Sequence, residues 1–464
     1  MKKRILLIYP PSPVLNREDR CQQPTKDLIV IPPLPPTDLM YLAAVAEKAG
    51  LEAKINDYSQ NGDYEADLKE FNPDYLVVNI ATPTLEHDLD AVKKAKEICP
   101  DVITIAKGAA FLTLADRIIK EHNELDFGIL GEAENTLKEI LEGKPKAEIL
   151  GLYYKENDEV KFTGNRPFIE DLDSLPFPAR HLVDNNIYRR PDNNKVQATI
   201  KVSRGCPFHC FFCLATPVSG AKVRRRSPEN IVAEIKECVE KYNIKNFLFW
   251  SDIFNIDKDW TMKLCQTIID SGLKITWSAN TRADTADLEM AEMMYKSGCR
   301  LVSIGVESGS QYMLEKMGKK ITLNDVRRTV KVFKKAKIRI YNYFVIGLPW
   351  ETEETVEETI KFAIELNSDF ISFYTATPLP GSRFYDYALE HNLFDKETSF
   401  ENAYYYPAVN THNLSRERVF ELHKSAIKRF YLRPLYIFKM LSRIRSFAEI
   451  KNYFIAGMNV LLRK

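Results

Sequence analysis

The segment Ser203-Arg-Gly-Cys-Pro-Phe-His-Cys-Phe-Phe-Cys213 decides how the rest of the chain is interpreted. Its cysteines, Cys206, Cys210 and Cys213, follow the spacing C-x3-C-x2-C. Three thiolates at this spacing suit a four-iron, four-sulfur cluster and leave the fourth iron without a protein ligand, where a small chelating molecule can bind. The alternative is a structural zinc site that is completed by His209 or by a distant cysteine. Both interpretations predict a metal-binding loop.

Short apolar runs alternate with helical patterns along the chain, which is typical of strand-helix-strand units and of parallel sheets. The first such series covers residues 1–145. Its expected strands are at residues 5–9, 53–57, 75–80, 102–106 and 127–130. One expected helix begins with Thr37 or Asp38 as its N-cap and ends at Gly50. This region is therefore predicted to be a Rossmann-like, doubly wound parallel sheet in an α/β protein.

A second series, residues 195–392, contains six strand-helix units. Its expected strands are at residues 198–202, 246–250, 274–278, 301–306, 339–346 and 370–376. Six units fit a (β/α)6 partial TIM barrel, in which catalytic groups are expected at the carboxyl ends of the strands. Residues 146–194 are predicted to form a hairpin and a proline-rich linker, and residues 393–464 a helical C-terminal cap.

Composition sets wide limits on the class of protein. The 464 residues are 45% hydrophobic and 28% charged, which is ordinary for a globular protein with sizeable cores. A total of 65 basic and 64 acidic residues leaves a net charge near zero, so no electrostatic footprint points to nucleic acid. Eight cysteines are too few for a disulfide scaffold, and the N-terminal apolar run is too short for a secretory signal. We therefore expect a cytoplasmic protein with ordinary buried thiols at Cys21, Cys99, Cys238, Cys265 and Cys299.

The cysteine segment closely resembles the signature of radical S-adenosylmethionine (radical SAM) enzymes. In that family the three cysteines hold a [4Fe-4S] cluster, and the open iron chelates the amino and carboxylate groups of SAM. One electron from the cluster then breaks the sulfonium and yields a deoxyadenosyl radical. The resemblance makes Cys206, Cys210 and Cys213 the metal ligands and catalytic residues, and it places Phe212 against adenine.

The ends of the second and third barrel strands also match the family. Asp252 follows the second strand, where the family holds the SAM amino group, and a carboxylate can accept that ammonium bond. A helix N-cap or a turn is the alternative role for Asp252. Arg282 ends the third strand and is expected either to pair with the SAM carboxylate or to support the cluster loop.

The fourth and fifth strands add the remaining SAM-binding candidates. The stretch Ser303-Ile-Gly-Val-Glu-Ser308 resembles the family's G-x-E-S strand, in which Glu307 and Ser308 would bond the ribose or methionine part of SAM, with Ser303 a further candidate. Burying a carboxylate without a partner is costly, which favours a functional role for Glu307. Gly347, in a G-x-P-x-E-T turn, would let the backbone approach the adenine edge.

The N-terminal series resembles the cobalamin-binding domain of cobalamin-dependent radical SAM enzymes, because of its position and its Gly131-Glu-Ala-Glu and Ile31-Pro-Pro-Leu-Pro-Pro36 stretches. The resemblance implies cobalamin at the strand ends. The candidate contacts are Pro10, Asp57, Thr82, Gly108, Gly131 and Glu132. The chain has no D-x-H-x-x-G motif, which implies a corrin bound without a protein histidine. Lys107-Gly-Ala-Ala110 replaces a common glycine pair and histidine, so a domain that kept the fold and lost the cofactor is the alternative.

The resemblance implies a methyltransferase that acts on an unactivated carbon or on phosphorus through a deoxyadenosyl radical and methylcobalamin. The alternatives are an oxidative cyclase of the magnesium-porphyrin ester type and a cobalamin or Fe-S redox sensor. The expected partners are a small-molecule substrate, which can be hydrophobic, and an electron donor such as flavodoxin or ferredoxin, but not nucleic acid. The basic, apolar segment 429–464 suits either an anionic membrane surface or a helical cap on the barrel mouth.

Overall fold

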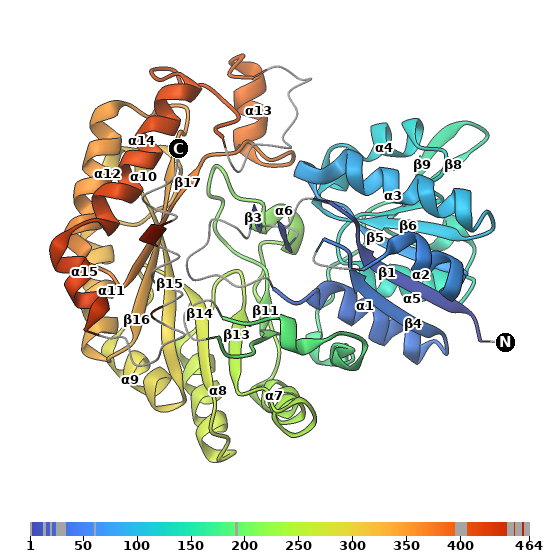
Figure 1. The fold of residues 1–464 in the computed structure, drawn as a ribbon, viewed down its shortest axis with the longest axis horizontal. Coiled ribbons are helices and arrows are strands. Elements are labelled where there is room, and N and C mark those ends of the chain that lie inside the picture. Colours follow the sequence, from blue (N-terminus) through green and yellow to red (C-terminus); the bar gives the residue numbers. More distant parts are fainter. Residues whose placement is uncertain are drawn as a thin grey trace.

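The computed structural model describes residues 2–12, 34–59, 62–190, 194–394 and 406–442, the backbone of 15–18 and 21–24, and residues 450, 457 and 458. The described chain forms two lobes, an N-terminal one in blue and cyan and a C-terminal one in green to red (Figure 1). Each lobe is built around one large sheet of mainly parallel strands, which confirms the predicted α/β class.

The N-terminal lobe has a seven-stranded sheet in the described chain, in the order β4-β1-β5-β6-β7-β8-β9. Its strands are β1 (Arg4–Tyr9), β4 (Glu52–Asp57), β5 (Tyr75–Asn79), β6 (Ile103–Lys107), β7 (Phe127–Ile129), β8 (Leu152–Glu156) and β9 (Glu159–Phe162). The first five strands run parallel to one another. Strand β8 pairs with β7 in the antiparallel direction, and β9 pairs with β8 in the same way. The predicted hairpin thus extends this sheet. Strands β2 (Leu15–Glu18) and β3 (Cys21–Pro24) form a separate antiparallel pair.

Helices cover both faces of this sheet. They are α1 (Thr37–Lys48), α2 (Tyr64–Phe71), α3 (Leu85–Ile98), α4 (Ala115–Glu121) and α5 (Ala133–Leu141). Alternate residues of β1 enter different cores, Ile5 and Leu7 on the side of α1 and α5, Leu6 and Ile8 on the side of α2 and α3. Because successive side chains of a strand point to opposite faces, this alternation confirms the doubly wound sheet.

The start of α1 differs from the expectation. Either Thr37 or Asp38 was expected as the N-cap, but Pro36 occupies that position and makes no side-chain capping bond. Asp38 is a residue of the first helical turn, and its carboxylate forms ion pairs with Lys201 and Lys107. Asp38 therefore serves the junction between the lobes rather than the helix end.

The linker ties the two lobes together through three short 3-10 helices, η5 (Leu172–Ser174), η6 (Arg180–Leu182) and η7 (Asn185–Ile187). Arg180 is buried, pairs with Glu234, and donates to the Thr199 carbonyl at 2.9 Å and to the Cys238 sulfur at 3.0 Å. The Ala179 amide donates to the Met40 carbonyl at 3.0 Å. A buried arginine that is bonded on every side fixes the linker to the barrel.

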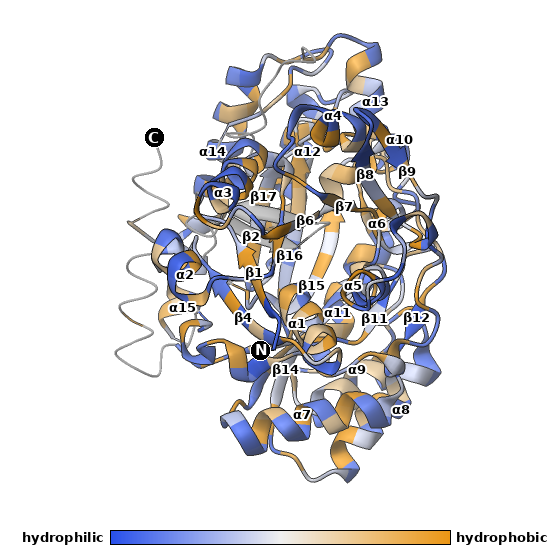
Figure 2. Cartoon of the chain, turned by 90° about the vertical axis from the view of Figure 1, so that its right-hand side faces the viewer, coloured by the Kyte–Doolittle hydropathy of each residue, from blue (hydrophilic) through white to orange (hydrophobic). Residues whose placement is uncertain are grey.

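The C-terminal lobe has a six-stranded parallel sheet in the described chain, in sequential order. Its strands are β10 (Ala198–Lys201), β13 (Asn246–Trp250), β14 (Thr276–Arg282), β15 (Cys299–Glu307), β16 (Arg339–Ile346) and β17 (Phe370–Thr375). Strands that pair only with their chain neighbours form an open partial barrel, as predicted. Figure 2 shows strands such as β1 and β15 in hydrophobic colours among helices of mixed colour.

Helices form the outer layer of the barrel. They are α7 (Pro228–Tyr242), α8 (Lys258–Asp270), α9 (Leu288–Lys296), α10 (Gln311–Lys316), α11 (Leu323–Lys335), α12 (Glu353–Leu366), α13 (Arg383–Glu390), α14 (Arg416–Tyr431) and α15 (Pro434–Leu441). Helix α14 packs on β17, where His423 Nε2 lies 2.7 Å from the Phe373 carbonyl oxygen. The described C-terminal helices thus extend the outer layer.

Candidate functional site

The cysteine segment forms a loop between the short strand β11 (Ser203–Arg204) and helix α6 (Ala215–Ser219). Cys206, Cys210 and Cys213 are all partly exposed on it. The Thr216 hydroxyl donates to two carbonyls of the loop, at 3.1 and 2.9 Å, and so fixes its curvature. Gly205 has φ 99°, and a Cβ there would overlap the Lys222 carbonyl oxygen. The loop is therefore shaped by local bonds that leave its thiols accessible.

Arg282 supports this loop from β14. Its guanidinium lies 3.7 Å from the ring centroid of Phe208 and pairs with Asp284 at 2.8 Å. It also donates to the carbonyls of Lys319 and Lys320. Of the two expected roles, these contacts favour support of the loop over pairing with the SAM carboxylate.

The chemistry of the loop fits an iron-sulfur cluster. In the described residues, no three His, Cys, Asp or Glu side chains are grouped to hold one metal ion. Three thiolates of a cluster bind three different irons, so their sulfurs are not ligands of one ion. His209 is exposed, and four further cysteines are buried in other elements. These are Cys99, Cys238, Cys265 and Cys299.

Glu307 has a strained backbone and a buried partner. Its φ is 68°, in the left-handed region that a non-glycine residue rarely adopts, and β15 is irregular between Gly305 and Glu307. The carboxylate accepts a bond from Lys319 Nζ at 2.7 Å. Sequence reasoning missed Lys319, which stands in a turn without a recognisable motif.

The two serines near Glu307, Ser303 and Ser308, have different contacts in the structure. The Ser303 hydroxyl accepts a bond from the Tyr343 hydroxyl at 3.2 Å. Ser308 is fully buried, and its hydroxyl lies 3.0 Å from that of Thr359 in α12. In this structure the Ser308 hydroxyl contacts the outer helix layer.

The other SAM-binding candidates lie near the barrel mouth. Asp252 accepts a bond from the Gly205 amide at 2.7 Å and so holds the residue directly before Cys206. Gly347 has φ 99°, and a Cβ there would come within 2.9 Å of Val419 in α14, so packing as well as backbone conformation requires glycine. Phe212 is half-buried against the barrel core, whereas its neighbour Phe211 is buried among aromatic rings.

The N-terminal candidates follow the carboxyl ends of parallel strands, as expected. Pro10 is buried, Asp57 accepts two bonds from Ser59 at 3.1 and 2.5 Å, and Thr82 begins a short 3-10 helix. Gly108 has φ 147°, and a Cβ there would overlap the Ile80 carbonyl oxygen. None of these four lines the pocket described next.

A pocket lies at the junction of the two lobes, beside the cysteine loop. Its lining comes from both lobes: Asp38, Leu42, Lys107, Gly131, Glu132, Ala133, Glu134, Lys201, Ser203, Arg204, Val218, Ser219, Trp250 and Asp252. The structure thus brings the candidates Gly131, Glu132 and Asp252 together. Gly131 has no atom within 4 Å of the position of a Cβ, so the loop after β7 leaves open space. Ligands of doubly wound sheets bind at such strand ends.

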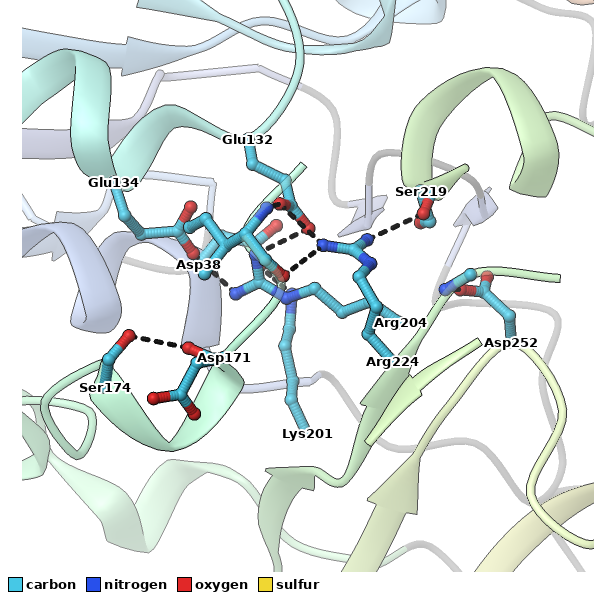
Figure 3. Close-up of polar contacts among 12 residues, drawn as sticks. Asp38, Glu132, Glu134, Asp171, Ser174, Lys201, Arg204, Ser219, Arg224 and Asp252 are labelled. Carbon is cyan, nitrogen blue, oxygen red and sulfur yellow. Dashed lines mark hydrogen bonds and ion pairs between the residues drawn. The ribbon is translucent and has the colours of Figure 1, made fainter. Parts of the chain in front are cut away.

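Buried ion pairs join the lobes around this pocket (Figure 3). Glu132 lies 2.9 Å from Arg224 and 3.1 Å from Arg204, and Glu134 lies 2.5 Å from Arg204. Burial alone would raise the pKa of Asp38, but Lys201 and Lys107 outweigh it and hold that pKa far below its usual range. Sequence reasoning missed the basic partners, although the run Arg224-Arg225-Arg226 was a visible signal.

Glu132, a predicted cobalamin contact, lines the pocket and also takes part in the junction between the lobes. Its carboxylate also accepts a bond from the Ile169 amide at 2.6 Å, in addition to the two arginines. One oxygen of this carboxylate accepts the bonds from Ile169 and Arg224, and the other lies in the ion pair with Arg204, so Glu132 joins the N-terminal lobe to the linker and to the base of the cysteine loop. Its contacts in this structure are with protein groups.

Comparison with known proteins gives two matches to family models. Residues 200–363 match the radical SAM superfamily, and residues 32–141 match the B12 binding domain. Among curated proteins, the chain is 31% identical over 438 residues to uncharacterized methyltransferase PH0819 of Pyrococcus horikoshii, which covers 89% of this chain and 94% of the relative. It is 26% identical over 421 residues to the anaerobic magnesium-protoporphyrin IX monomethyl ester cyclase of Cereibacter sphaeroides, covering 86% of this chain and 67% of the relative.

A solved structure shares the two-lobed fold. The radical S-adenosylmethionine methyltransferase TsrM of Kitasatospora setae, with cobalamin and a [4Fe-4S] cluster bound, matches with a TM-score of 0.68 at 19% identity. The match covers 84% of this chain and 75% of that chain.

Proposed function

The chain belongs to the cobalamin-dependent radical SAM enzymes, and from this premise we propose that it is a methyltransferase acting on a small molecule. The acceptor is an unactivated carbon or a phosphorus centre of a substrate bound between the lobes. One observation carries the proposal: the two elements that flank the cysteine loop, β11 and α6, line a single pocket together with the ends of β6 and β7 of the B12-binding domain. An enzyme that combines radical chemistry with methyl transfer needs both cofactors to reach one substrate.

The cofactors supply the difficult chemistry when bound: a [4Fe-4S] cluster and SAM provide hydrogen abstraction, and cobalamin provides the methyl group. The residues of this chain bind, orient and exclude water. Cys206, Cys210 and Cys213 hold the cluster, and Arg282 and Asp252 fix the loop that carries them. The candidates for contacts to SAM remain Phe212, Asp252, Arg282, Ser303, Glu307, Ser308 and Gly347.

The N-terminal lobe both lines the pocket and positions the cysteine loop. Gly131 and Ala133 line the pocket with small side chains on the B12 side, while Glu132 and Glu134 hold the base of the cysteine loop. Pro10, Asp57, Thr82 and Gly108 remain candidates for the more distant part of cobalamin. The buried ion pairs keep the two cofactor sites at a fixed separation.

We also propose partners and a location. Flavodoxin or ferredoxin would supply electrons, and the protein would work in the cytoplasm. Helix α15 exposes Leu435, Phe438 and Leu441 beside Lys439, which suits peripheral contact with an anionic membrane. No helix of the described chain has the length and hydropathy to span a membrane.

The test uses protein that is purified without oxygen and reconstituted with iron, sulfide and hydroxocobalamin. Iron and cobalamin are counted per chain. SAM with a labelled methyl group and reductant are then added together with candidate acceptors. The proposal expects deoxyadenosine, S-adenosylhomocysteine and label in the acceptor.

The outcomes separate the alternatives. Deoxyadenosine with an oxidised, unlabelled product would favour the cyclase, to which the chain is less similar. Bound cofactors with no cleavage of SAM under any reducing condition would favour a redox sensor and overturn the proposal.

A further inference from the structure

Lys319 stands in the turn between α10 and α11 and is buried, with 8% of its surface exposed. Its Nζ lies 2.7 Å from the Glu307 carboxylate, and the side chains of both residues are 11% exposed. A Cβ on Gly305 would come within 3.0 Å of that Nζ, so the ion pair lies directly over a glycine of β15. The pair is therefore buried and rests against the backbone of β15.

The turn that carries Lys319 rests on the cysteine loop. The Phe211 amide donates to the Met317 carbonyl at 2.9 Å, and a Cβ on Gly318 would lie 3.7 Å from the His209 carbonyl oxygen. The Arg282 guanidinium, stacked on Phe208, donates to the Lys319 carbonyl. Contacts to residues 208, 209 and 211 enclose Cys210 from the side of this turn.

Lys319 interacts electrostatically with the Glu307 carboxylate and with the sulfur of Cys210. Burial alone would lower the pKa of Lys319, but the Glu307 carboxylate and the Cys210 thiol more than offset it, and the net pKa is raised. Lys319 thus contributes a buried, ion-paired cation to the turn that packs against the cysteine loop. Water screens such a buried charge far less than an exposed one.

We propose that Lys319 is a positioning residue that makes the cluster easier to reduce, through a fixed positive charge held beside Cys210 by Glu307. This inference rests on the proposed function, because it assumes a cluster on the cysteine loop. The step is a one-electron reduction from the 2+ to the 1+ state, with dithionite as the donor. A nearby cation stabilises the more negative, reduced state. Glu307 orients the cation and partly offsets its field.

The test is an EPR-monitored redox titration of reconstituted holoenzyme with dithionite and mediators. Lys319→Met is expected to lower the equilibrium constant for reduction at least tenfold. For a one-electron step this shifts the midpoint potential of the cluster by about 59 mV in the negative direction. Lys319→Arg keeps the charge and is expected to stay within threefold of the wild type. The double variant Lys319→Met with Glu307→Gln removes both charges, and its change is expected to be smaller than that of Lys319→Met alone.

Lys320→Met is the matched control, because it removes an exposed lysine from the same turn, and it is expected to leave the potential unchanged. A Lys319→Met protein with full iron and the wild-type potential would overturn the inference. If Lys319→Met binds no iron, Lys319→Arg decides: full iron and a wild-type potential support the role of the charge, whereas loss of iron in both assigns Lys319 to folding and overturns it. If the cluster of the wild-type protein gives a normal redox titration but the protein transfers no methyl group, the result counts against the proposed function and not against the role of Lys319.

Discussion

The Glu132 carboxylate of the N-terminal lobe lies 2.9 Å from the Arg224 guanidinium of the C-terminal lobe, and their side chains are 8% and 2% exposed. Arg224 also donates to the carbonyls of Ile169 and Ser219, each at 2.7 Å. One ion pair thus connects the B12-binding domain, the linker and the helix that follows the cysteine loop.

Glu132→Gln should destabilise the junction by about 3 kcal/mol, because it leaves two buried arginines with less compensating charge. The change is measurable by urea unfolding followed through tryptophan fluorescence, since all four tryptophans belong to the C-terminal lobe. Glu170→Gln is the control, because Glu170 pairs with Lys222 on the exposed surface, and it should change nothing measurable. Equal effects of the two changes would contradict the role of Glu132.

Alanine at Cys206, Cys210 or Cys213 should each reduce reconstituted iron to below a quarter of the wild-type content and abolish deoxyadenosine. Each change removes one of three protein ligands from the cluster. Iron and sulfide analysis with EPR measures this. Cys265→Ala is the control, because burial raises the pKa of that thiol to about 12 and it should not bind iron. Unchanged iron in any of the three loop variants would refute the assignment.

Arg282→Lys should lower iron incorporation severalfold, although it preserves the charge. Lysine lacks the planar guanidinium that stacks on Phe208 and reaches two carbonyls of the neighbouring turn. Iron per chain after reconstitution is the measurement. Arg300→Lys provides the comparison, because Arg300 stacks at 4.3 Å on Tyr295 at the opposite end of the sheet and should tolerate the change. Full iron in the Arg282 variant would show that the loop does not depend on the stack.

Glu351 should make the barrel less stable as the pH rises from about 4.5 to above 7. Burial raises the pKa of its carboxyl to about 7, despite the bonds from Thr355 and Gly347. The folded state therefore binds more protons than the unfolded state in this range, and stability falls by about 3 kcal/mol across it. Glu351→Gln should remove this slope, which is read from the wild-type minus variant difference in melting temperature at pH 5 and 8. If the difference in melting temperature between wild type and variant is the same at pH 5 and pH 8, the assignment of the pH dependence to Glu351 is wrong.

Gly108→Ala should destabilise the N-terminal lobe by more than about 2 kcal/mol, because a Cβ there overlaps the Ile80 carbonyl oxygen as well as straining the backbone. Gly131→Ala, with φ 86° but open surroundings, should cost only the strain, about 1 kcal/mol. Thermal unfolding followed by circular dichroism compares the two variants. The opposite order of stability would exclude the overlap as the cause.

The local sequence was sufficient to predict most of the elements. Strands β13 and β16 have the predicted bounds, because apolar runs between turn residues define a buried parallel strand. Strand β14 was predicted at residues 274–278 but runs from Thr276 to Arg282, because it stays paired with β15 up to Arg282. The hairpin β8–β9 was predicted, but its addition to the N-terminal sheet depends on pairing with β7, which no local pattern encodes.

The sequence by itself determined the family, the cysteine loop and the order of the two lobes, because each depends on residues close together in the chain. Only the tertiary structure decided which charges meet. Glu132 and Arg224 are 92 positions apart, Arg282 and Lys319 are 37 apart, and Glu307 reaches Lys319 across a turn. Such pairs form where two lobes or two strand ends pack, and the favourable energy of a buried charge comes from a partner that sequence spacing does not reveal.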